Sequence, residues 1–311
     1  MLSRTAASLY WIGRYVERAE FIARLIEATV RLDALSARPA GRIAWESALA
    51  VADVVEEYAL TGDSITPQNV ANYLSLSPDN PSSIRSCLDY ARGNARAVRT
   101  ALTRDAWEAI NRAWLGLRGR SSTGNVQSTL SLVEDIRAEA RGFEGALHRM
   151  LLSEAHHFIA LGAAIERADN TARLIDVKYH LLLPEGEHIG GLVDRDQWTT
   201  ILHTVSAVTA YRWLYQDGLS AAQVAELLIL RPELPRSLAA STLEIVNQLT
   251  ALSNRTGLTG EAEVTARARH AALRKRTIGA IIKIGTHEYL TQFIEGNAKL
   301  DGLIAKQFRF A

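Results

Sequence analysis

Between residues 9 and 30, apolar side chains recur at steps of three and four, the repeat of an α-helix. They define one apolar face, a second lies on the far side, and charge is largely confined to a strip between them. The first face holds Leu9, Gly13, Val16, Ala19, Ala23, Ile26 and Val30, the second Trp11, Ile22 and Leu25, and the strip Glu17, Glu20, Arg24 and Glu27. This pattern predicts a helix at the centre of a bundle.

Helical patterns continue through the rest of the chain, and few segments alternate as β-strands do. The chain has only seven prolines, and Thr66-Pro67 reads as a helix start with a cap and a proline in the first turn. The predicted fold class is therefore all-α. Further helices are expected at about 43–60, 80–102, 195–216, 220–230, 234–254, 260–295 and 298–309.

Part of the first helix occurs twice. Residues 13–27 match residues 162–176 without a gap, and both segments contain Glu-Arg-Ala and Ala-Arg-Leu-Ile. Further matches follow in the same order: Trp45 with Trp198, Tyr58 with Tyr211, and Pro78, Pro81 and Ser83 with Pro232, Pro235 and Ser237. A shared helical pattern alone would not keep Trp, Tyr and Pro-x-x-Pro in order. We therefore predict a duplicated helical bundle with two pseudo-twofold-related repeats and a C-terminal helical extension.

The duplication and the length of 311 residues suggest four segments. Residues 1–120 form the first repeat, 121–149 a linker and connecting helix, 150–255 the second repeat, and 256–311 the C-terminal helices. The stretch 116–124, rich in Gly, Ser and Arg, is the clearest linker. A core of this size needs no disulfide or metal for stability.

The repeated Glu-Arg pairs are the main candidate chemistry. Adjacent helical residues point about 100° apart, so Glu17 and Arg18 do not pair well with each other. Arg18 lies on an apolar side of its helix and needs a carboxylate partner. If the repeats pack about a pseudo-twofold axis, Arg18 meets Glu166 while Arg167 meets Glu17. This structural interpretation is the favoured one.

The alternative is a binding site for an anion or carboxylate. Arg24 and Arg173 occupy matching positions and have planar guanidinium groups that bind carboxylates through two hydrogen bonds. Asp169 belongs to the same motif, at the position that matches Glu20.

A weaker candidate is a metal site at Glu154 and His157. Glu-x-x-His on a helix places both side chains on one face, as in di-metal carboxylate bundles. Such sites need two of these motifs, and the other instance, Glu185 to His188, lies in a Gly- and Pro-containing stretch. A surface or capped pair is the plainer interpretation.

Other chemistry is not indicated. Cys87 lies on an apolar helix face, and the chain has no Gly-x-Ser-x-Gly, Walker A or Gly-x-Gly-x-x-Gly pattern, so no cofactor is expected. The formal net charge of +1 does not favour nucleic-acid or anionic-membrane partners. No uncharged apolar run approaches the ~20 residues of a membrane helix, and the single cysteine fits a reducing compartment. We expect a cytoplasmic protein.

The stretch from Tyr10 to Glu20 resembles the bacterial alpha-E domain family, a helical family named for its Glu-Arg motif. The resemblance extends along the chain through 80–84, 94–99, Trp107-Glu108, 156–158, 166–169 and 176–180. Members are typically encoded beside, or fused to, circularly permuted ATP-grasp ligases, often with transglutaminase-like proteins and sometimes a proteasome-like peptidase. The resemblance implies a role with an ATP-dependent peptide or amide ligase. It carries over no catalytic residues.

Three hypotheses follow. The first is a non-catalytic helical scaffold or accessory subunit of the ligase, with Trp107, Trp114, Trp213 and Tyr215 as candidate anchors for a partner. The second is an enzyme acting on a peptide-like substrate through Glu17, Arg18, Glu166, Arg167 and His157. The third is a metal-binding helical bundle.

Overall fold

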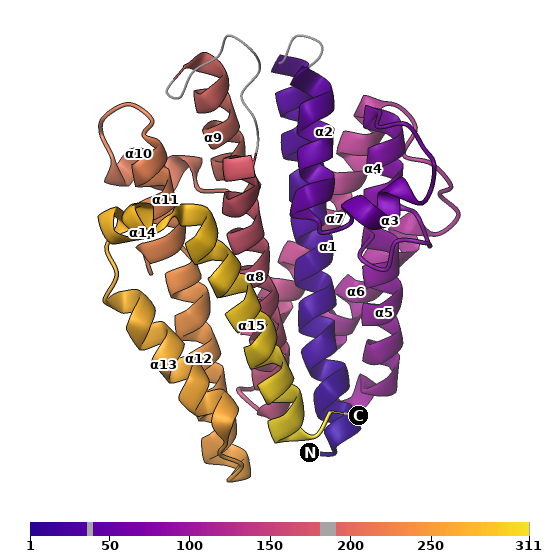
Figure 1. Ribbon diagram of the computed structural model, residues 1–311. Coiled ribbons are helices and arrows are strands. Elements are labelled where there is room, and N and C mark those ends of the chain that lie inside the picture. The colour runs from indigo at the N-terminus through magenta and orange to yellow at the C-terminus, as the bar shows by residue number, and fades with distance from the viewer. Residues whose placement is uncertain (36–39, 181–190, 311) are drawn as a thin grey trace.

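A computed structural model describes residues 1–35, 40–180 and 191–310. Within these ranges the chain forms fifteen α-helices and a short 3-10 turn, with no β-strand, which confirms the all-α class (Figure 1). The helices are α1 (Ser3–Leu35), α2 (Ala40–Val51), α3 (Val55–Ala59), α4 (Pro67–Ser75), α5 (Ile84–Ala97), α6 (Arg104–Leu117), α7 (Val126–His148), α8 (Glu154–His180), α9 (Leu192–Thr204), α10 (Val208–Leu214), α11 (Ala221–Leu230), α12 (Leu238–Thr256), α13 (Glu261–Arg274), α14 (Ile278–Ile284) and α15 (Thr286–Phe308).

The long helices α1 and α8 lie side by side in the middle of the bundle and run in the same direction (Figure 1). Helices α2, α5 and α7 pack on α1, and α12 and α15 pack on α8. The two central helices touch through a pair of glycines. A Cβ atom on Gly13 would lie 2.0 Å from the carbonyl oxygen of Ile159, and one on Gly162 would lie 2.0 Å from that of Tyr10. Only glycine allows this approach, which fixes the register of α1 against α8.

Two predicted helices are each broken once, so those predictions were wrong. The segment 43–60 ends its first helix at Val51 and resumes at Val55, and the segment 195–216 is interrupted in the same way between α9 and α10. The breaks contain Asp53 and Ser206, whose φ angles are +58° and +57°. This left-handed conformation is uncommon for residues other than glycine. Apolar periodicity continues through both breaks and therefore hides them.

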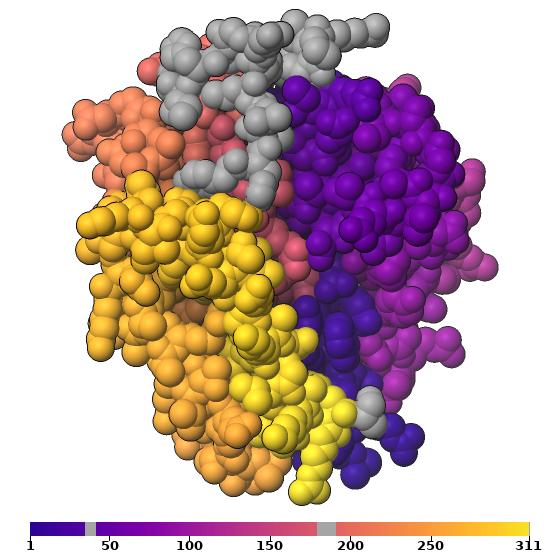
Figure 2. All heavy atoms as spheres, viewed as in Figure 1, coloured from indigo at the N-terminus to yellow at the C-terminus, as the bar shows by residue number. Residues whose placement is uncertain are grey.

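The C-terminal extension also differs from the prediction. The segment 260–295 comprises α13, α14 and the start of α15, and no boundary separates 295 from 298, because α15 is continuous from Thr286 to Phe308. Gly285, with φ of +108°, ends α14 in a conformation that glycine adopts readily. Helix α15 returns the chain toward the start of α1, and Figure 2 shows it lying against the lower part of that helix.

The interior is divided into two apolar cores along the bundle axis. One core takes Ala19 and later residues of α1 together with Ala168 and later residues of α8. The other takes α1 up to Val16 and α8 up to Ile165. Both cores contain residues of both predicted repeats, so the segments 1–120 and 150–255 fold against each other. The two Glu-Arg pairs lie between the cores and form a buried charged layer across the bundle.

Candidate functional site

Both reciprocal ion pairs expected from the sequence are present in the charged layer. Arg18 donates from Nε to Glu166 Oε1 at 2.6 Å and from Nη2 to Oε2 at 3.0 Å. Arg167 donates from Nη2 to Glu17 Oε2 at 2.7 Å. The two carboxylate side chains are only 3% and 6% exposed. Gly13 and Gly162 lie one helical turn before Glu17 and Glu166. Their close contact fixes α1 against α8 and so brings each Glu opposite the Arg of the other helix.

Each motif carboxylate also binds a second arginine that sequence reasoning missed. Arg14 donates from Nε to Glu166 Oε2 at 2.8 Å, and Arg236 donates from Nη1 to Glu17 Oε1 at 2.6 Å. Arg14 lies one turn before Arg18, a spacing that places both on one face and could have indicated this role. Arg236 lies in the loop before α12, where local sequence gives no such signal. Each carboxylate is thus held by two guanidinium groups.

The next acidic position in each copy of the motif binds an arginine of its own helix. Glu20 Oε1 accepts from Arg24 Nε at 3.0 Å, and Asp169 Oδ2 accepts from Arg173 Nε at 2.7 Å. Arg236 Nη2 also reaches Glu20 Oε2 at 2.8 Å, so it bridges the two carboxylates of α1. The structure therefore gives Arg24 and Arg173, the candidate anion-binding forks, carboxylate partners within the protein.

The two broken helices supply the remaining partners of these arginines. Arg173 Nη1 lies 3.1 Å from Asp53 Oδ2, and Arg24 Nη1 donates to the hydroxyl of Ser206. Asp53 and Ser206 both have a left-handed backbone and lie within the two helix breaks. Their side chains contact the arginines of the charged layer from there.

The carboxylates of the layer differ in acidity. Burial raises the pKa of Glu17, but the guanidinium groups of Arg167 and Arg236 outweigh burial and lower this pKa to about 2. Burial also raises the pKa of Glu166, but the guanidinium groups of Arg18 and Arg14 outweigh burial and lower this pKa. In contrast, burial raises the pKa of Asp169 more than the ion pair with its own arginine lowers it. Glu17 and Glu166 are therefore permanently charged near neutral pH.

A hollow of about 260 Å³ opens beside the Glu166 half of the layer. Its walls come from α1, α8, α15 and the loops after α2 and before α5, and it opens on the face seen in Figure 2. The charged groups that line it are Arg14, Arg18, Asp53, Glu166, Asp169, Arg173 and Asp301. Beside the Glu17 half lies a smaller hollow of about 100 Å³. A third hollow, of about 330 Å³, lies at Arg24 and Ser206, so the charged layer is accessible from more than one side.

The weak metal candidates have separate partners. Glu154 Oε2 lies 3.1 Å from the amino group of Met1, and His157 Nδ1 donates to Gln248 Oε1 at 2.7 Å. Among residues 1–35, 40–180 and 191–310, no three His, Cys, Asp or Glu side chains come together to hold a metal ion. The second Glu-x-x-His stretch, 185–188, lies outside the described residues.

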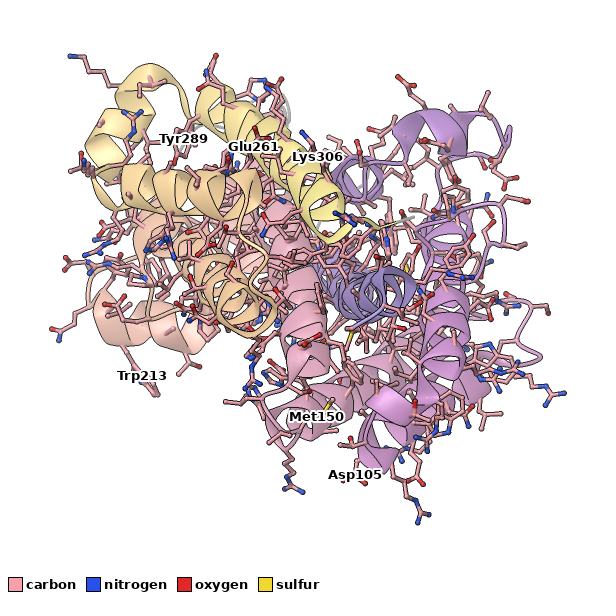
Figure 3. The ribbon with its side chains drawn as sticks, turned by 90° about the horizontal axis from the view of Figure 1, so that it is seen from below. Asp105, Met150, Trp213, Glu261, Tyr289 and Lys306 are labelled. Carbon is pink, nitrogen blue, oxygen red and sulfur yellow. The ribbon has the colours of Figure 1, made fainter. Side chains whose placement is uncertain are left out.

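Cys87 and two of the candidate aromatic anchors differ in how far solvent reaches them. Cys87 is fully buried, as predicted, and burial raises the pKa of its thiol to about 12. Trp114 stacks on the guanidinium of Arg92 at 3.9 Å, whereas Trp213 is 79% exposed. Figure 3 shows the Trp213 side chain projecting outward from α10.

The Glu-Arg layer leads to the comparison with known families. A family model described as alpha-E, a predicted alpha-helical domain with a conserved ER motif, matches residues 1–308. The chain belongs to the alpha-E family. Both copies of Glu-Arg in this alpha-E protein lie in the buried layer between its two cores. Neither the curated proteins nor the solved structures include a match. No helix in the described part of this alpha-E chain is long and apolar enough to cross a membrane.

Proposed function

We propose that this alpha-E protein is a non-catalytic helical scaffold, an accessory subunit of an ATP-grasp peptide or amide ligase. The observation that carries the proposal is the double arginine clamp on each motif carboxylate. Glu17 and Glu166 use both oxygens to bind guanidinium groups, and both pKa values are lowered. A general base works best with a pKa near the operating pH and a free oxygen for the proton. The motif thus suits holding and binding better than proton transfer.

The scaffold consists, in this proposal, of two pseudo-twofold-related repeats. Matched contacts support the duplication: the pairs Arg18 with Glu166 and Arg167 with Glu17, and the reciprocal glycine contacts of α1 and α8. The capping serines Ser83 and Ser237 also match, since each accepts from the backbone N–H three residues later, at α5 and at α12. Two related helical units provide two related surfaces on one subunit.

The partner we propose is a circularly permuted ATP-grasp ligase, since family resemblance associates alpha-E chains with such enzymes. A transglutaminase-like protein of the same system is a further candidate. The exposed Trp213 is the anchor that we propose for a partner, because exposed tryptophans are frequent hot spots of interfaces. The same proposal places the protein in the cytoplasm, without nucleic-acid or membrane partners.

Co-purification with purified components tests the proposal. The tagged alpha-E chain and the ATP-grasp ligase of the same host should elute together in size-exclusion chromatography. Trp213→Ala should weaken the association, whereas Trp114→Ala, which alters a tryptophan stacked within the protein, should not. The alpha-E chain alone should hydrolyse no ATP. Separate elution at micromolar concentrations, or ATP turnover by the isolated chain, would contradict the proposal.

One observation favours the alternative of an enzyme acting on a peptide-like substrate. Asp169 lines the open hollow beside Glu166, and their pKa values are shifted in opposite directions. Carboxylates with divergent pKa values are a feature of acid-base pairs in active sites. If Asp169 is such an acid, Asp169→Asn should lower the turnover of the complete ligase system by ~100-fold or more without unfolding the chain. The metal-binding alternative has no comparable support in the described residues.

A further inference from the structure

One residue in the wall of the hollow beside Glu166 has a buried polar atom without a partner. Asn170 is only 8% exposed and lines this hollow, and its side-chain nitrogen has no hydrogen-bond partner. A buried amide group without a partner costs free energy, and such groups are usually satisfied by protein, water or a ligand. This nitrogen is itself shielded from the open space, so it marks an unsatisfied polar group in the wall and is not a contact for a ligand.

The Glu17 half of the layer indicates what belongs there. On α1, Glu17 and Glu20 are bridged by the guanidinium of Arg236, at 2.6 and 2.8 Å. The matching carboxylates on α8 are Glu166 and Asp169. In the matched Pro-x-x-Pro segments, the residue before each capping serine is Arg236 in one copy and Ser82 in the other.

Ser82 leaves the corresponding space open. Ser82 lines the hollow, and its hydroxyl accepts a long hydrogen bond, 3.4 Å, from Arg18 Nη1. Arg14 supplies a second guanidinium to Glu166. Among the described residues, Asp169 binds one guanidinium, that of Arg173. The hollow is thus the counterpart of a place that a cation fills in the other half of the layer.

The charge of the lining agrees with a missing cation. Four carboxylates line the hollow, against three guanidinium groups, which leaves one negative charge. The carboxylates are Asp53, Glu166, Asp169 and Asp301, and the guanidinium groups are Arg14, Arg18 and Arg173. One bound cation would neutralise the lining. It would also bring a second positive partner to Asp169, whose pKa burial now raises.

We propose that this hollow binds the guanidinium or primary ammonium end of a peptide-like ligand, in the position that Arg236 takes in the other half. The positive group lies by Asp169, beside the hydroxyl of Ser82. The inference deepens the proposed function, since it names the chemical class that the scaffold presents to the ligase.

Three matched probes test this site on the purified chain. Nα-acetyl-arginine amide and Nα-acetyl-lysine amide carry one positive group, and Nα-acetyl-citrulline amide is the neutral isostere of the arginine probe. Calorimetric titration at constant ionic strength should show that both cationic probes bind, the arginine probe at least ~10-fold more tightly than its citrulline isostere. Equal affinity for the arginine and citrulline probes, or binding by none at millimolar concentration, would overturn the proposal.

Two variants locate the binding in the hollow. Ser82→Arg should fill it from within and abolish binding of the arginine probe, while the matched Ser82→Ala should bind like the wild type. Asp169→Asn should lose the discrimination between arginine and citrulline probes, and it serves alone if Ser82→Arg does not fold, as judged by circular dichroism. Undiminished binding by folded Ser82→Arg, or intact discrimination by Asp169→Asn, would overturn the assignment. No ligase is present in these titrations, so their failure is distinct from a failure of the scaffold proposal.

Discussion

Glu17→Gln removes one charge from the buried layer and leaves its shape almost unchanged. The Glu17 carboxylate is 6% exposed and binds Arg167 at 2.7 Å and Arg236 at 2.6 Å. Glutamine offers one oxygen where the carboxylate offers two, and it carries no charge. Among the described residues Arg167 then has no carboxylate partner left, whereas Arg236 keeps Glu20. We expect the variant to fold with much lower stability.

Two routes give the magnitude. Breaking one partner of a buried ion pair costs about 3–5 kcal/mol. Independently, the pKa of Glu17 falls from 4.5 to about 2 on folding, which corresponds to about 3 kcal/mol at 1.36 kcal/mol per pKa unit. Because the folded-state pKa is depressed, this stabilisation is present above pH 4.5 and is lost as the pH falls toward 2.

Urea unfolding of wild type and Glu17→Gln, at pH 7 and again at pH 3, measures both features. The wild type should exceed the variant by about 3 kcal/mol at pH 7, and this difference should shrink by about 2 kcal/mol at pH 3. Glu46→Gln is the control, since Glu46 pairs with Arg42 on an exposed helix surface and should contribute at most about 1 kcal/mol. A Glu17→Gln effect as small as the control, or one independent of pH, would refute the reasoning.

Three further predictions follow from the same packing. Gly13→Ala should destabilise the fold by about 1–3 kcal/mol or more in thermal unfolding, because the new Cβ would meet the backbone of α8. Gly93 has open space around it, so Gly93→Ala should be neutral or stabilising by up to about 1 kcal/mol. Equal effects of the two changes would contradict the helix contact. Arg18→Met combined with Glu166→Gln should cost less than the sum of the single changes by about 1–3 kcal/mol in a double-mutant cycle, and additive losses would refute a direct pair. The fully buried Cys87 thiol, with its pKa raised to about 12, should resist iodoacetamide in the native state at pH 8, so rapid stoichiometric alkylation would show that it is accessible.

The central helices of the fold are predictable from the sequence because their pattern is local. Steps of three and four along α1 indicate a helix, and its two apolar faces indicate a central position. The breaks at Asp53 and Ser206 are not predictable in this way. Neither residue is Gly or Pro, and the apolar pattern continues on both sides, so only the folded structure shows the left-handed backbone.

Part of the candidate site was likewise predictable from the sequence and part was not. The pairing of Arg18 with Glu166 follows from the repeat, because an arginine on an apolar face needs a carboxylate and the matched copy supplies one. The roles of Arg14 and Arg236 depend on tertiary packing, and Arg236 reaches Glu17 from 219 positions away. The proposed cation site rests on the difference between Arg236 and Ser82, which is visible in the sequence but has meaning only once both halves of the layer are seen.

The rate of amide formation by the ATP-grasp ligase of the same host, measured against increasing amounts of this alpha-E chain, tests the central claim most directly. ADP release and product are followed together at fixed ligase concentration. A scaffold predicts no product from the chain alone and a saturable rise in the ligase rate as the chain is added. ATP-dependent amide formation by the chain alone, or a ligase rate that stays constant at saturating chain concentration, would contradict the account.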